Sequence, residues 1–114
     1  IIEIKANFWQ AINNKGLIYF EKDDISLAIT NFKKAIEIER NPESMLALGV
    51  SLKDTNMKKS ILLVKEALQK NPNYVSFDYR KEQLWGGKLQ KETEELFKME
   101  ELRKDVSIAN LYKN

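Results

Sequence analysis

Apolar residues recur every three or four positions along much of this chain, which is the spacing expected of amphipathic helices. Between residues 12 and 42 the pattern runs along one stretch, breaks at a short polar segment and then resumes. Small and large residues alternate within it, so that a ring on one helix can sit in a notch on the other. The stretch therefore predicts a helical hairpin whose seam is formed by Ile12, Gly16, Tyr19, Ala28, Phe32 and Ala35.

The same hairpin pattern recurs once along the chain. A step of 33 residues from the first helix leads to Met45, Gly49 and Leu52. A step of 32 residues from the second helix leads to Ser60, Val64 and Ala67, because one residue is missing from the turn. A period of this size is typical of helical repeat proteins.

These positions resemble the signature of the tetratricopeptide repeat family. Residues 35–39 resemble the usual end of the second helix, with Arg40 where the family has proline and Pro42 two residues late, whereas Pro72 stands at the family position. The resemblance implies an all-α solenoid of antiparallel hairpins with about six helices in one domain, residues 1–114. Its parts are repeat 1 at about 9–41, repeat 2 at about 42–73, a divergent capping hairpin at about 74–106 and a tail at 107–114.

Local signals place the first four helices at about 1–20, 25–40, 42–54 and 57–70. The helical pattern of the first of them becomes secure near residue 3 or 5. Asp23 or Asp24 is expected to cap the second helix, and Asn41-Pro42-Glu43 to begin the third. Asn71 is expected to take a left-handed conformation after the fourth helix, and Asn73 to cap the next one.

Beyond Tyr74 the match to the repeat pattern weakens. A fifth helix is expected through Phe77 and Trp85, ending at Gly86-Gly87, and a sixth from Lys88 to Val106. Residues 107–114 are expected to form a short final turn, capped by Ser107, or a frayed tail.

Composition narrows the classes of function. The chain contains no Cys and no His, which removes thiol nucleophiles, Cys or His metal sites and the usual neutral-pH base. A net charge of +2, from 19 basic and 17 acidic residues, gives no long-range attraction for nucleic acid. No apolar run approaches the ~20 residues needed to span a bilayer. The chain begins at Ile1, so we expect a longer protein; a cytoplasmic location is favoured.

Catalysis is not expected, and neither are a cofactor or a metal ion. The carboxylates are scattered over predicted polar helix faces, and clusters of them are expected by chance in a chain with so many charged residues. Gly86-Gly87 precedes Lys88 with no strand before it and no Ser or Thr after it, so it cannot form a phosphate-binding loop.

The resemblance gives a binding surface instead. In such repeats the first helix of each hairpin lines a concave groove, and four of the matching positions here are apolar. The alternative is that the chain's own last helix fills this groove. The clamp by which related repeats grip acidic chaperone tails is absent, since the matching positions carry Asn13, Leu17 and Ala47. The predicted groove residues are Asn13, Leu17, Phe20, Leu46, Val50, Lys53, Tyr79 and Arg80, the last being a candidate for meeting an acidic group with help from Lys53.

The sequence thus favours a non-catalytic scaffold or assembly factor that binds a protein or peptide, as a monomer or weak homo-oligomer. The alternative is a structural or oligomerisation domain that self-associates through Trp9 or through the stripe from Leu96 to Val106.

Overall fold

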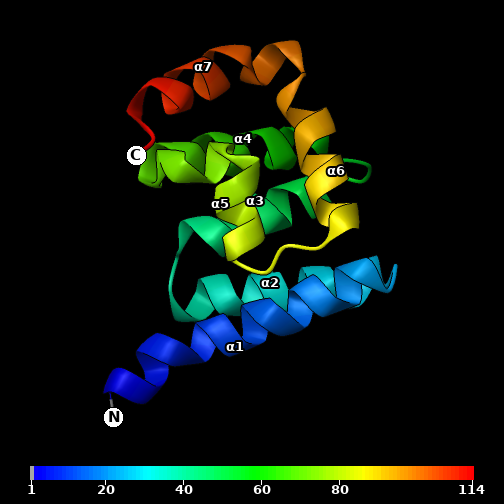
Figure 1. The fold of residues 1–114 in the computed structure, drawn as a ribbon. Coiled ribbons are helices and arrows are strands. Elements are labelled where there is room, and N and C mark those ends of the chain that lie inside the picture. The colour runs from blue at the N-terminus through cyan, green and yellow to red at the C-terminus, as the bar shows by residue number, and fades with distance from the viewer. Residues whose placement is uncertain (1) are drawn as a thin grey trace.

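The computed structural model describes residues 2–114, with side chains described from Phe8 onward. Ile1, which the predicted first helix includes, lies outside this range. The described residues contain helices and no strand, and their order runs from the blue N-terminal helix to the red C-terminal one (Figure 1). The helices are α1 (Ile2–Glu21), α2 (Ile25–Ile38), α3 (Pro42–Ser51), α4 (Met57–Lys70), η1 (Pro72–Val75), α5 (Phe77–Glu82), α6 (Gly87–Phe97), η2 (Glu100–Leu102) and α7 (Arg103–Tyr112).

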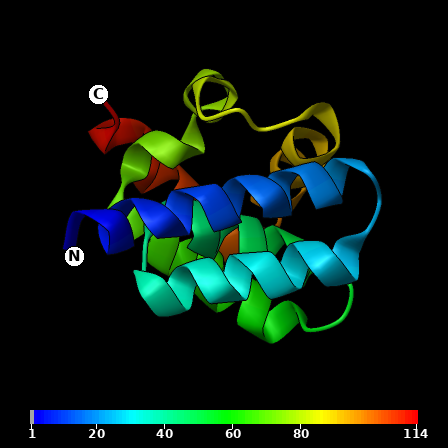
Figure 2. The same cartoon turned by 90° about the horizontal axis from the view of Figure 1, so that it is seen from below.

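The first four helices form two hairpins. Helices α1 and α2 lie side by side, α3 packs against α4, and α2 contacts α3 (Figures 1 and 2). A Cβ at Gly16 would lie 2.5 Å from a ring carbon of Phe32, and one at Gly49 would lie 3.0 Å from Val64. Both glycines therefore allow the paired helices to approach closely, as the alternation of small and large residues predicts.

Local capping signals fix the starts of α2 and α3 as predicted. The Asp24 carboxylate accepts a hydrogen bond from the Leu27 amide at 3.3 Å, and the Asn41 side chain accepts one from the Ser44 amide at 2.7 Å. Pro42 occupies the first turn of α3, where its missing N–H is not needed. Helices α2 and α3 end two or three residues earlier than predicted, at Ile38 and Ser51.

The segment after Pro72 departs from the predicted pair of helices. The short helices η1 and α5 replace one fifth helix, because Tyr74 and Val75 turn into the core. The prediction for Asn71 is wrong: its backbone is extended, with φ of −148°. Ser76 caps α5 in place of Asn73, accepting from the Tyr79 amide at 3.3 Å.

The predicted sixth helix is broken in two. Helix α6 ends at Phe97, η2 follows, and α7 continues to Tyr112, so the predicted tail is mostly helical and Ser107 lies inside a helix. No Pro or Gly lies between residues 97 and 103. The break follows from packing: α6 contacts α1 and α3, whereas α7 contacts α4 and η1. A straight helix cannot lie along both sets of neighbours.

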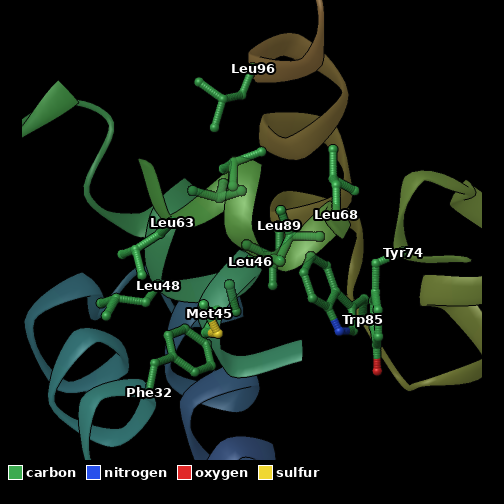
Figure 3. Close-up of a cluster of buried hydrophobic side chains, with 14 of the residues drawn as sticks. Phe32, Met45, Leu46, Leu48, Leu63, Leu68, Tyr74, Trp85, Leu89 and Leu96 are labelled. Atoms are coloured by element: carbon green, nitrogen blue, oxygen red, sulfur yellow. The ribbon is translucent and has the colours of Figure 1, made fainter. Parts of the chain in front are cut away.

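One hydrophobic core connects the two hairpins with the C-terminal helices. Phe32 and Met45 lie at the side of the first hairpin, Leu46 and Leu89 lie in the middle, and Trp85 and Tyr74 lie at another edge of the cluster (Figure 3). Within residues 2–114 no helix combines the length and the apolar character that crossing a membrane requires.

Candidate functional site

The predicted concave groove is part of the core. Leu17, Phe20, Leu46 and Val50 are each at least 96 % shielded from solvent, and α6 lies over α1 and α3. These side chains are therefore not a free surface, and the prediction of an open concave groove is wrong. Of the two alternatives that the sequence left open, filling by the chain's own C-terminal segment describes the structure, because that segment needs the same apolar area for its own burial.

Lys53 and Tyr79 are half-buried and engaged within the chain. The Lys53 ammonium lies 3.0 Å from the Glu92 carboxylate and 3.6 Å from Asp54, and the hydrogen bond to Glu92 raises the pKa of Lys53. The Tyr79 ring packs edge-on against Tyr74, with 5.0 Å between the ring centroids. Neither side chain presents its polar group to an open groove.

Arg80 is 0 % exposed, and its guanidinium is the most enclosed charge among the described residues. It donates at 2.7 Å to the Gln90 side chain and at 2.7 Å to the Tyr74 carbonyl, and it forms an ion pair with Glu94. Its guanidinium carbon lies 5.2 Å from the Phe97 ring centroid. Desolvation lowers the pKa of Arg80, against the opposing effect of Glu94. The acidic group that Arg80 meets belongs to its own chain.

The predicted self-association stripe is also largely internal. Leu96 and Leu102 are buried, and Met99 and Val106 pack against the core. Trp9 is half-buried on α1.

A second buried charge, Glu43, lies in the first turn of α3. Its carboxylate accepts hydrogen bonds from Asn13 at 2.8 Å, from the Trp85 indole at 3.2 Å and from the Tyr74 hydroxyl at 3.4 Å. Ser44 Oγ donates to the Asn13 side chain at 2.7 Å, which orients that amide. Asn13, predicted to line a groove, is thus a buried link between α1 and α3.

Burial is the main influence on the electrostatics of this cluster. Desolvation raises the pKa of Glu43, while the three hydrogen bonds, that from Trp85 first, oppose the shift. The pKa of Tyr74 is also raised, by burial and then by the Glu43 charge. The sequence predicts Glu43 at a helix start, and no local pattern indicates that Trp85, 42 residues later, donates to it.

The accessible surface beside this cluster consists of two adjoining recesses along α1. The first, which we call the apolar groove, has a volume of about 520 Å³ and is lined by Asn14, Leu17, Ile18, Glu21, Lys22, Leu84 and Gly86. The second, which we call the polar recess, has a volume of about 210 Å³ and is lined by Gln10, Asn14, Glu43, Glu82, Gln83 and Leu84. They share Asn14 and Leu84, so they form one continuous surface.

Glu21 holds the two sides of this surface together. Its carboxylate accepts from the Lys88 amide at 2.9 Å and from the Leu89 amide at 3.0 Å, which caps the free N-terminus of α6. Gly86 lets Glu21 reach these amides, because a Cβ there would overlap the Glu21 side chain. The interaction fixes the start of α6 against α1.

Leu84 is the exceptional residue of the surface. Its φ is 71° and its side chain is 72 % exposed, and Ile18, across the apolar groove, is 56 % exposed. Among residues 2–114 the other non-glycine residue with positive φ is Asp23, a type that tolerates this region, whereas leucine rarely adopts it. Strained backbone and exposed apolar area therefore coincide at one position.

Among the described residues no group of three or more acidic side chains is arranged to hold a metal ion. Comparison of the chain with protein-family models, with curated proteins and with solved structures gives no match.

Proposed function

We propose that the protein is a tetratricopeptide-like helical repeat module without catalysis of its own, which binds a short segment of another protein in the apolar groove. The two hairpins support the repeat interpretation, because Gly16 and Gly49 make equivalent close approaches 33 residues apart. In this proposal the C-terminal helices cap the solenoid and fill the concave side, so that the partner binds along α1 instead.

The single observation that carries the proposal is Leu84. A leucine in the left-handed region costs on the order of 1–3 kcal/mol, and such strain concentrates at functional positions. Here it presents an apolar side chain to solvent opposite Ile18, where burial by a partner would recover the free energy lost by exposure. The left-handed backbone at Leu84 closes the C-terminus of α5, since the Trp85 amide donates to the Arg80 carbonyl at 3.2 Å. That role favours Gly or Asn and does not account for an exposed leucine side chain.

The size of the groove limits the partner. About 520 Å³ holds one or two large side chains, which suits a short linear segment better than a folded surface. Such contacts usually give moderate affinity, since the buried area is small.

Peptide display against the whole chain tests the proposal. We expect selected peptides to carry a large apolar residue and to lose binding when Ile18→Asp or Leu84→Asp is introduced. Leu62→Asp on α4 is the matched control, since Leu62 is equally exposed at 59 % but lies outside both recesses. Ile18→Asp and Leu62→Asp should retain the wild-type melting temperature, and Leu84→Asp should melt no lower than the wild type, since Asp tolerates positive φ. Failure to select any peptide, or selection of peptides that ignore Ile18, would refute the proposal.

A second candidate function is self-association through α7. Ile108, Leu111 and Tyr112 follow helical spacing and are exposed, forming an apolar stripe at the C-terminal end. Sedimentation at two concentrations decides this candidate: a strict monomer rejects it, and a dimer lost in Leu111→Lys supports it.

A further inference from the structure

We propose that the polar recess takes the ammonium group of a lysine side chain of the partner, next to the apolar residue that occupies the apolar groove. This inference rests on the proposed function and specifies its partner. The continuity of the two recesses at Asn14 and Leu84 places the apolar and the charged contact side by side.

The charge balance at Glu43 provides the first argument. Glu43 is only 7 % exposed, yet all three of its hydrogen-bond donors are neutral groups. Among residues 8–114 no Lys or Arg nitrogen comes within 4.0 Å of its carboxylate. A buried carboxylate without a counter-ion is unfavourable, and a ligand cation removes that penalty.

The unused hydrogen-bonding capacity of Glu43 provides the second argument. One carboxylate oxygen, Oε2, accepts two bonds, from Asn13 and Trp85, whereas Oε1 accepts one contact of 3.4 Å from Tyr74. Each carboxylate oxygen has room for about two donors. Oε1 therefore retains an open acceptor position. A single ammonium matches one open oxygen, whereas the two-bond pairing that favours a guanidinium uses both oxygens of a carboxylate.

The lining of the polar recess provides the third argument. Glu82 adds a second carboxylate, and Gln10, Asn14 and Gln83 carry amide oxygens that can accept from the remaining ammonium protons. A volume of about 210 Å³ exceeds the ~30 Å³ that one water occupies in the liquid. The recess thus has room for an ammonium group with part of its aliphatic stem.

Titration of the ¹⁵N-labelled whole chain with n-butylammonium chloride tests the recess directly. The Trp85 indole N–H reports on Glu43, because it donates to that carboxylate, and the Trp9 indole N–H serves as an internal reference. We expect a saturable shift of the Trp85 signal with butylammonium, and none with n-butanol at the same ionic strength. Glu43→Gln should abolish the shift. Glu37→Gln, which changes an exposed carboxylate on α2, should leave it intact.

A second arm distinguishes a partner lysine from a free amine. Peptides selected for binding to the apolar groove are compared with versions in which Lys is replaced by norleucine. We expect about tenfold weaker binding to the wild type, and no difference between the two peptides for Glu43→Gln.

The outcomes separate the two proposals. Butylammonium binding with selected peptides that lack an essential lysine overturns the partner lysine and assigns the recess to free amines. No Trp85 shift together with peptides that bind through Ile18 overturns the cation site and leaves the proposed function standing. If the Trp85 shift is seen but no peptide is selected, the proposed function fails and the partner lysine fails with it.

Discussion

Replacing Arg80 by Lys tests the buried contacts of this residue most sharply, because the change keeps the positive charge and removes the planar set of donors. The guanidinium reaches Gln90, the Tyr74 carbonyl and Glu94 at once. An ammonium on a shorter stem reaches one of them. Glu94 is half-exposed and can be solvated again, but the Gln90 and Tyr74 oxygens would lose their charged donor inside the protein.

The magnitude follows from those two acceptors. Each buried acceptor left without a donor costs about 1–3 kcal/mol, so we expect Arg80→Lys to lower the free energy of unfolding by about 2–6 kcal/mol. The entropy of unfolding for 114 residues is about 0.24 kcal/mol per kelvin, so each kcal/mol lowers the melting temperature by about 4 °C. The expected fall is therefore about 8–24 °C.

Thermal unfolding followed by circular dichroism measures the effect, and Arg40→Lys is the matched control. Arg40 also forms two hydrogen bonds to a carboxylate, that of Glu66, at 2.9 and 2.7 Å, but on the surface. Exposed pairs contribute about 0–1 kcal/mol, so the control should melt within about 4 °C of the wild type. If both variants melted alike, Arg80 would not be the buried link described above.

Three further predictions address packing, ionisation and strain. Gly16→Ala should lower the free energy of unfolding in chemical denaturation, because its Cβ would lie 2.5 Å from the buried Phe32 ring. Gly87→Ala, with nothing within 4 Å, should not lower it; equal effects of the two changes would contradict the close approach of α1 and α2 at Gly16. Burial raises the pKa of Glu43 above its ordinary 4.5, so the folded state holds that proton more tightly. The unfolding free energy of the wild type relative to Glu43→Gln should therefore be highest below pH 4.5 and fall as the pH rises through the raised value; a difference that rises with pH would reverse the sign and refute this. Leu84→Asn should raise the melting temperature by about 2–4 °C, since Asn tolerates positive φ, while it weakens peptide binding; an unchanged affinity would show that the strain serves another purpose.

The sequence predicts the N-terminal hairpins well because their signals are local. The caps at Asp24 and Asn41 act over three residues, and the seam at Gly16 and Phe32 follows from helical periodicity alone. The C-terminal part lacks such signals. No residue type marks the break after Phe97, which arises because α6 and α7 pack on different neighbours.

The candidate site was the least predictable part. Helical spacing identified Leu17 and Leu46 as apolar positions away from the hairpin seam, but it could not show what covers them. The same limit applies to Arg80, whose burial requires partners up to 14 residues away on α6.

By itself, the sequence determined the helical class, the first four helices and the caps of α2 and α3, since each depends on residues within one or two turns of chain. The tertiary structure alone decided that the C-terminal segment fills the predicted groove, that Glu43 is buried against Trp85, and that Leu84 faces solvent. These outcomes depend on contacts between residues that are distant in the chain. All the apolar faces compete for burial, so the residues near one face do not decide whether that face is covered.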